Sequence, residues 1–199
     1  MVSLYTIKET KIVEQVIKHS KFIAVIVPID NEDSIKEIIQ SYKEEYPKAN
    51  HYCYAFIKEN EKGMSDDKEP AKTAGAPMLQ VLEKENLINV LAIVIRYFGG
   101  IKLGPGGLIR AYSSSVQEVL TNVEKVKVEQ GYQITIQFPF EQEKQINYVL
   151  KNSKILTKTY QDKCYYQVEI TKEKLEQLKN IVTIINQQEK LITKKDTNQ

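Results

Sequence analysis

The 199-residue sequence lacks tryptophan and contains only two cysteines, Cys53 and Cys164. Two cysteines so far apart do not form a disulfide framework, so we expect a reduced, cytoplasmic setting. The N-terminus lacks the basic segment and apolar stretch of a secretory signal. No apolar run approaches the ~20 residues that a membrane-spanning helix needs. These absences predict a cytoplasmic protein that is not inserted in a membrane.

Neither sign of charge is in marked excess, since 28 lysines and arginines stand against 26 acids. A net charge of +2 excludes the overall basic coat of an obligate nucleic-acid-binding protein. Residues 1–125 carry 16 basic and 17 acidic residues, a net charge of −1, whereas residues 126–199 carry 12 and 9, a net charge of +3. Any basic surface on this protein is therefore expected to be local.

A glycine-rich loop follows the most apolar stretch of the chain. Residues 90–95, VLAIVI, are too few for a helix and rich in β-branched side chains, which predicts a buried strand. Apolar residues at three- and four-residue spacing predict a helix over 108–123. Between the two lie five glycines: Gly99, Gly100, Gly104, Gly106 and Gly107. A loop of this kind presents backbone N–H groups and the positive end of the helix dipole.

Three cations accompany these glycines, Arg96, Lys102 and Arg110, and the sequence places no acid between them. Ser113 and Ser114 follow three and four residues after Arg110, on the same face of the predicted helix. Donors and cations without a competing acid predict an anion-binding site. The Walker and dinucleotide-binding patterns are both absent, so a turn whose glycines serve only chain reversal stays an equal alternative.

The segment 60–77 predicts a long loop that carries three acids, Asp66, Asp67 and Glu69. Loops longer than ~12–15 residues are usually functional or disordered. Carboxylates gathered in this way can hold Mg²⁺ or pair with arginines. From residue types alone, a solvated acidic loop is the simpler interpretation.

A strand predicted over residues 50–57 places His51 and Cys53 on one face. A cysteine beside a histidine can act as a nucleophile and its base. Direct neighbours on one strand rarely do so, and a free cysteine is usually a small buried hydrophobic residue. His19 is the only other histidine, which leaves too few ligands for a metal site. We predict neither a catalytic nor a metal-binding role for this pair.

A second domain is predicted after residue 125. Residues 132–140 alternate apolar and polar side chains, the pattern of a strand with one buried face. A helix over 141–151, a hairpin over 155–170, a helix over 172–180 and a last strand over 181–192 follow. This βαββαβ order is that of a ferredoxin-like domain. We expect domains 1–125 and 126–199, joined by a linker over 124–131.

Three blocks of the sequence resemble the signatures of the YigZ/IMPACT family. They are NHYCYA at 50–55, DDKEPAKTAG at 66–75, and RYFGGIKLG at 96–104 continuing to RAYS at 110–113. In the second block, Lys68, Ala71 and Lys72 stand where the family usually has Gly, Ser and Gly. The resemblance covers residues from about 15 to 123, and the remainder is similar to the second domain of bacterial YigZ-type members.

The resemblance implies an α+β protein of two domains. The first is expected to be a two-layer α/β sandwich similar to domain IV of elongation factor G. The second is expected to be ferredoxin-like, similar to domain V of that factor. Eukaryotic members regulate translation by binding the activator of an initiation-factor kinase, whereas bacterial members have no settled activity. The proline dipeptidase label given to some of them needs a cluster of metal ligands that this sequence lacks.

The favoured functional hypothesis is a non-catalytic module that binds an anionic translation component, either RNA of the ribosome or a translation factor. The alternative is an enzyme acting on a phosphorylated small molecule or nucleotide, with an acid of the long loop as metal ligand or base. A purely structural loop is a weaker third. No catalytic residue, cofactor or metal is assigned. The candidate binding residues are Arg96, Gly99, Gly100, Lys102, Gly104, Gly106, Gly107, Arg110, Ser113, Ser114, Asp66, Asp67, Glu69 and Thr73.

The acidic loop and the glycine-rich loop carry opposite charges, and both are signature blocks of the family that the sequence resembles. We therefore expect them on the same side of the first domain. At least one of Asp66, Asp67 and Glu69 is expected beside Arg96 or Arg110, because such pairs position a site.

Overall fold

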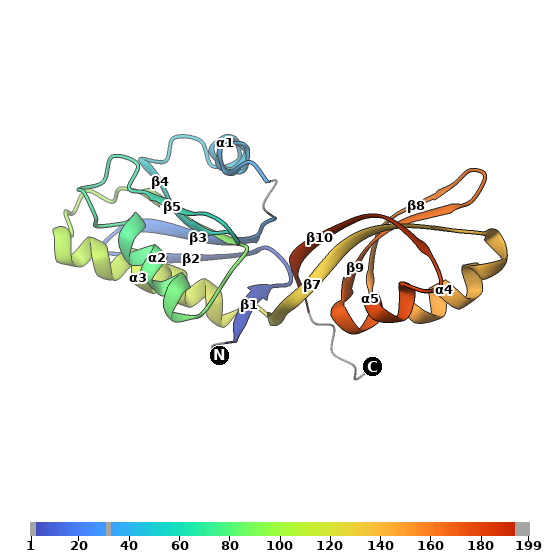
Figure 1. Cartoon of the computed structure of the whole chain (residues 1–199). Coiled ribbons are helices and arrows are strands. Elements are labelled where there is room, and N and C mark those ends of the chain that lie inside the picture. The colour runs from blue at the N-terminus through green and yellow to red at the C-terminus, as the bar shows by residue number, and fades with distance from the viewer. Residues whose placement is uncertain (1–2, 31–32, 194–199) are drawn as a thin grey trace. The chain divides into compact units, whose positions relative to one another are not determined.

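The computed structural model describes residues 3–30 and 33–193. The chain divides into two compact units, Met1–Lys125 and Val126–Gln199, and Figure 1 colours them from blue to yellow-green and from yellow to red. In the part of the chain that the structure describes, no helix has the length and apolar character needed to cross a membrane.

The first unit is built on an antiparallel sheet in the order β2-β3-β6-β4-β5. The central strand β6 is the predicted apolar run, and each of its residues from Val90 to Arg96 is buried. Burial on both faces explains why this strand is apolar throughout rather than alternating. The strands are β2 (Lys11–Ile17), β3 (Ser20–Pro28), β4 (His51–Ile57), β5 (Lys62–Ser65) and β6 (Val90–Tyr97), with a short β1 (Leu4–Ile7) beside them.

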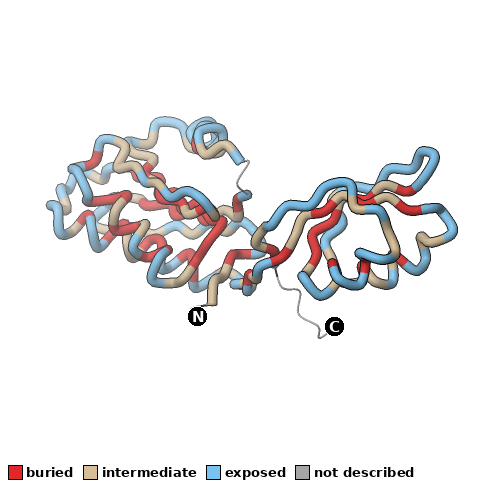
Figure 2. The backbone as a smooth tube through the Cα atoms, viewed as in Figure 1, coloured by how far each residue is buried: buried red, intermediate tan, exposed pale blue. Residues whose placement is uncertain are grey.

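Helices cover both faces of this sheet. Helices α2 (Gly75–Lys84) and α3 (Pro105–Thr121) pack on one face, and α1 (Ile35–Glu45) lies over the other (Figure 1). Alternate strand residues supply two cores, with Phe22 and Val94 facing α3 and Ile23 and Ile93 facing α1. Figure 2 shows this burial concentrated along the strands. Helix α1 thus adds a layer on the second face to the expected helix-and-sheet arrangement, because that face is apolar as well.

The second unit has the βαββαβ order of a ferredoxin-like domain. Its strands pair in the antiparallel order β10-β7-β9-β8. Apolar residues of the strands and of both helices form one core, in which Phe138 meets the ring of Tyr166 edge-on. The elements are β7 (Lys125–Phe138), the 3-10 turn η1 (Phe140–Gln142), α4 (Glu143–Val149), β8 (Lys154–Tyr160), β9 (Cys164–Thr171), α5 (Lys172–Leu178) and β10 (Thr183–Thr193). The predicted α+β class is confirmed.

The predicted linker over 124–131 is wrong. Strand β7 begins at Lys125 and pairs with β10 from Val128 onward, and Val128 is buried. Only residues 122–124 separate α3 from β7. Exposed charged residues alternate with Val126 and Val128 in this segment. Its polar composition is therefore typical of a linker, although the segment forms a strand.

Candidate functional site

The glycine-rich loop joins β6 to α3, and two of its glycines have distinct structural duties. A Cβ on Gly99 would lie 2.0 Å from the backbone carbonyl carbon of His19, so only glycine lets the loop rest on the β2–β3 turn. Gly104 caps α3 with φ of 73°, a backbone conformation that favours glycine, and Pro105 takes the first helical position. Gly106 and Gly107 then present backbone N–H groups that have no partner among the described residues.

Two of the predicted cations face solvent beside these N–H groups. Lys102 and Arg110 are exposed, and neither has an acidic partner in residues 3–30 and 33–193. A third exposed cation, Lys18, comes from the tight turn after β2, where the backbone φ is 45°. Lys18 was not predicted, because nothing in the sequence places residue 18 next to residue 110.

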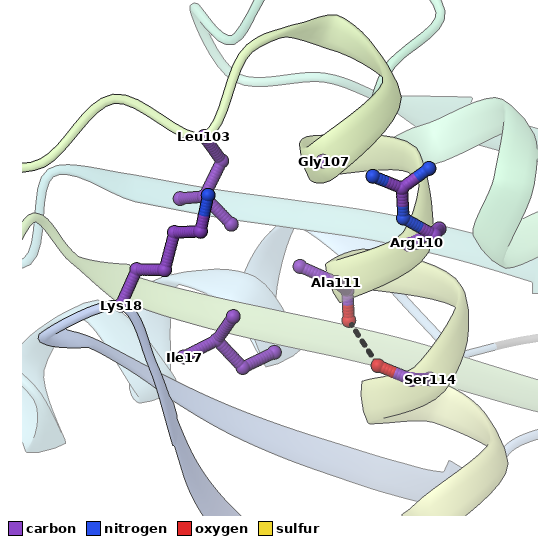
Figure 3. A pocket seen from close by; sticks show the side chains of 7 residues that line it. All are labelled: Ile17, Lys18, Leu103, Gly107, Arg110, Ala111 and Ser114. Atoms are coloured by element: carbon purple, nitrogen blue, oxygen red, sulfur yellow. Dashed lines mark hydrogen bonds between the residues drawn. The ribbon is translucent and has the colours of Figure 1, made fainter.

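Lys18 and Arg110 enter one cavity of about 230 Å³ from opposite sides, as Figure 3 shows. The hydroxyl of Ser114 donates to the carbonyl of Ala111 at 3.1 Å, which leaves its oxygen able to accept (Figure 3). The lining residues are Ile17, Lys18, Leu103, Gly107, Arg110, Ala111 and Ser114. This cavity joins two cations and the first turn of a helix, which is a favourable place for an anion.

The third predicted cation, Arg96, lies inside the unit instead. Its Nη1 donates to Glu69 Oε1 at 2.5 Å, and its Nη2 donates to the hydroxyl of Ser20 at 3.3 Å. Both members of the ion pair are buried. The expectation of an acid beside Arg96 or Arg110 is thus confirmed. Arg96 fastens the acidic loop to the sheet, however, and is not on the exposed surface with Lys102 and Arg110.

Glu69 is the centre of a buried polar cluster. Its Oε1 also accepts from the Tyr112 hydroxyl at 2.7 Å and lies 3.7 Å from His51 Nε2. The other ring nitrogen of His51, Nδ1, lies 2.8 Å from the carbonyl oxygen of Asp67, to which it donates. Burial raises the pKa of the Tyr112 hydroxyl, so Tyr112 stays a neutral donor. Tyr112 was not predicted as part of a polar site, because its position in the helical pattern indicated only a buried helix face.

The side chains of Cys53 and His51 do not form a nucleophile and its base. The Cys53 thiol is fully buried and lies 3.0 Å from the carbonyl of Asp66 and 3.4 Å from the Tyr112 hydroxyl. Burial raises the pKa of this thiol, which keeps it protonated. His51 bonds to a different part of the loop, so the two side chains share a face of β4 without acting on each other.

Asp66, Asp67 and Thr73 are used within the acidic loop itself. The Asp66 carboxylate accepts backbone N–H bonds from Lys72, Ala74 and Gly75 at 2.8, 3.0 and 2.8 Å. Asp67 Oδ2 accepts from the backbone of Tyr52 at 2.7 Å, and the Thr73 hydroxyl donates to the carbonyl of Pro70 at 2.6 Å. No group of three or more potential ligands is arranged around a metal position in the described chain.

Lys68 and Lys72 keep the loop geometry at the positions where the family usually has glycine. Their φ angles are 71° and 63°, in the left-handed region. The two lysines therefore adopt a backbone that glycine would adopt at lower cost. The acidic loop therefore forms both of these turns with lysine.

The two loops share a second cavity, of about 480 Å³. Glu69 and Pro70 come from the acidic loop, and Lys102, Leu103 and Gly104 come from the glycine-rich loop. Leu103 also lines the first cavity, so the two hollows are neighbours. The remaining lining residues are Asn50, His51, Arg96, Phe98, Pro105 and Leu108. Of the predicted binding residues, Gly99, Gly100, Gly106, Ser113, Asp66, Asp67 and Thr73 line neither cavity.

Comparison with known proteins places both loops in a shared family segment. Residues 18–120 match the Impact N-terminal domain. The chain is 46% identical over 128 residues to IMPACT family member YvyE of Bacillus subtilis, which covers 63% of this chain and 59% of that protein. It is 35% identical over 152 residues to IMPACT family member YigZ of Escherichia coli, which covers 73% of this chain and 74% of that protein.

A solved structure extends the similarity to both units. The crystal structure of a hypothetical protein superposes with a TM-score of 0.65 at 28% identity, covering 98% of this chain and 99% of that one. The family segment contains the acidic loop, the glycine-rich loop and most of α3. On these grounds the chain belongs to the IMPACT family.

Proposed function

We propose that this protein is a non-catalytic, translation-associated factor of the cytoplasm whose first unit binds RNA. The observation that carries the proposal is the group of three exposed cations, Lys18, Lys102 and Arg110, none of which has an acidic partner among the described residues. The link to translation rests on the resemblance to eukaryotic members of the family, which regulate it. The basic RNA-binding surface defined here consists of these three cations and the N–H groups of Gly106 and Gly107.

RNA is the partner that suits this surface best. Cations and backbone N–H groups contact phosphates without regard to base sequence. An extended strand offers phosphates at regular intervals, so one strand can reach both Lys102 and the cavity between Lys18 and Arg110. The net charge of the chain is only +2. The electrostatic free energy of binding RNA is therefore expected to come from a local basic surface. A translation factor with an acidic patch is the other anionic partner that the test below distinguishes.

The enzyme alternative is weakened by how the acids are used. A phosphoryl-transfer or metal-dependent site needs carboxylate oxygens that are free to hold a cation or take a proton. Both carboxylate oxygens of Asp66 accept hydrogen bonds from backbone N–H groups. Asp67 accepts from Tyr52, and Glu69 is paired with Arg96. The acids of the long loop thus stabilise its conformation and attach it to the sheet.

The proposal is tested by binding of labelled single-stranded RNA and by ribosome co-sedimentation. The double variant Lys102→Ala/Arg110→Ala is expected to bind RNAs of unrelated sequence more weakly, by a similar factor for each, because phosphate contacts carry no sequence information. The matched control is Lys36→Ala/Lys84→Ala, which removes two exposed lysines from α1 and α2 and is expected to bind like the wild type.

Equal binding by the double variant and the wild type contradicts the proposal. So does equal weakening in the double variant and the control, since that would report only the net charge. Binding of a protein factor without any binding of RNA would move the proposal to the translation-factor alternative. Binding of a phosphorylated metabolite that the double variant loses, while RNA affinity stays unchanged, would favour the enzyme.

A further inference from the structure

The 480 Å³ cavity between the two loops has polar groups at its floor that take no part in the proposed phosphate contacts. Glu69 lies at this floor and is 8% exposed, so it is more than nine-tenths buried. Its Oε1 accepts from Arg96 and Tyr112, whereas no hydrogen bond to Oε2 is found among the described residues. This oxygen is not one of the fully buried polar atoms without a partner, so it is accessible from the cavity and can accept a further hydrogen bond. The cavity is therefore ready for a ligand that brings an N–H donor.

A histidine nitrogen lies beside Glu69 at this floor. His51 Nδ1 donates to the carbonyl of Asp67, and its Nε2 lies 3.7 Å from Glu69 Oε1. Glu69 presents the acceptor at the cavity floor. An occupant that turned a carbonyl oxygen toward it would meet only another acceptor.

Phe98 gives the cavity an aromatic wall. Its side chain is 45% exposed, although the backbone is fixed by an N–H bond to Asn50 Oδ1 at 2.7 Å. The guanidinium carbon of the buried Arg96 lies 5.6 Å from the ring centroid, and this cation–π contact positions the ring. An exposed, positioned ring beside a lysine such as Lys102 is a stacking platform for a single-stranded base.

We propose that this cavity takes one unstacked base of the bound RNA strand and selects bases that carry an exocyclic amino group, namely adenine, cytosine or guanine. The base stacks on Phe98, and its amino group donates to Glu69 Oε2. Lys102 and the first turn of α3 hold the adjoining phosphates, since Leu103 separates this cavity from the one lined by Arg110. Uracil has no amino group, and its single donor, the ring N3–H, lies between two carbonyl oxygens that would face the carboxylate. The inference rests on the proposed RNA-binding function.

The test compares two RNAs that differ in one group. One is a nine-nucleotide uridine strand with a single central adenosine, and the other has purine riboside there, which replaces the amino group by hydrogen. Wild-type protein is expected to bind the adenosine strand about tenfold more tightly, the usual value of a hydrogen bond to a charged group. Phe98→Ala is expected to weaken both strands about tenfold through lost stacking, with the ratio reduced toward one. Tyr148→Ala, which removes a more exposed ring from α4, is the control and is expected to change neither strand.

Glu69→Gln adds a reversal test. The glutamine carbonyl can still accept from Arg96 and Tyr112, while its amide N–H₂ faces the cavity as a donor. The purine riboside strand is then expected to bind at least as tightly as the adenosine strand, whose amino group would meet another donor. If this variant does not fold, the wild-type ratio and Phe98→Ala decide the question.

Equal binding of the two strands by the wild type overturns the base-selection proposal. If Lys102→Ala/Arg110→Ala still weakens both strands in that case, the proposed RNA-binding function stands without it. If neither strand binds, both proposals fall.

Discussion

At the scale of single residues, the sequence predicted that charges of the two loops meet but not that Arg96 is buried. One of three acids was expected beside Arg96 or Arg110, and Glu69 lies beside Arg96. The burial of Arg96 follows from strand parity, because Arg96 lies within β6, one residue past the predicted strand, and on the same face as Val94, toward α3. Ending the predicted strand at residue 95 concealed this. Lys102 and Arg110 were predicted as surface cations, and both are exposed.

Substitution of two loop glycines tests how tightly the loop is fixed. Gly99→Ala is expected to destabilise the first unit, because the added Cβ would lie 2.0 Å from a backbone carbonyl that cannot move away freely. Gly106→Ala is the matched control, since only the end of the Arg110 side chain lies near, at 3.8 Å. That change is expected to raise the free energy of unfolding by about 0.5–1 kcal/mol. Urea unfolding measures both, and similar values for the two variants would contradict the close contact at Gly99.

The two cysteines are expected to be unreactive in the folded protein. Cys53 and Cys164 are both fully buried, and burial raises the pKa of each thiol. A coloured disulfide reagent at mildly alkaline pH is expected to titrate neither thiol in the native protein and both after unfolding in denaturant. Rapid labelling of the native chain would show that one of these sites opens.

At the scale of elements, hydrophobic pattern predicted the strands and helices whose apolar residues form a continuous run or a regular spacing. Strand β6, helix α3 and the hairpin of β8 and β9 lie where the pattern placed them. The start of β7 was missed because charged residues and Gly131 gave the segment the composition of a linker. The pairing of β7 with β10 supplies the hydrogen bonds that hold it as a strand, and no local pattern reveals a partner some 60 residues away.

A contact between α4 and strand β9 predicts a pH dependence in the second unit. The hydroxyl of Tyr166 donates to Glu143 Oε1, and Tyr160 donates to the same atom at 2.8 Å, which lowers the pKa of Glu143 below its ordinary value of 4.5. A lowered folded-state pKa contributes stability that is present above pH 4.5 and is lost as pH falls through the folded-state value. The stability of the second unit is expected to decline in that acidic window, and Glu143→Gln is expected to flatten the decline. An unchanged slope in the variant would assign the decline to other carboxylates.

At the scale of the whole molecule, the sequence predicted two domains, and the structure forms two compact units. The cavities were beyond prediction, because they arise where loops far apart in sequence come together on one sheet. Lys18 and Arg110 are separated by 92 residues, yet they line the same hollow. The antiparallel pairing of β2 with β3 and of β3 with β6 brings the Lys18 turn against the glycine-rich loop. Such a site requires the topology and not only the motifs.

Independent folding of the two units stays a prediction that a core substitution can test. Ile136 is fully buried in the second unit, and Ile136→Ala is expected to lower its stability by ~2–5 kcal/mol. Native-state hydrogen exchange is expected to show lower protection in β7, β9 and β10 and unchanged protection in β3 and β6. A matching loss of protection in both units would mean that the chain unfolds as one cooperative body.

The salt dependence of RNA binding tests the central claim most directly, because it counts phosphate contacts. The slope of log affinity against log salt concentration is to be measured for wild type, Lys102→Ala/Arg110→Ala and the control Lys36→Ala/Lys84→Ala. Two lost contacts, at about 0.7 each for a single strand, are expected to lower the slope of the double variant by about 1.4 while the control keeps the wild-type value. Identical slopes for all three proteins would contradict RNA binding at the surface of Lys18, Lys102 and Arg110.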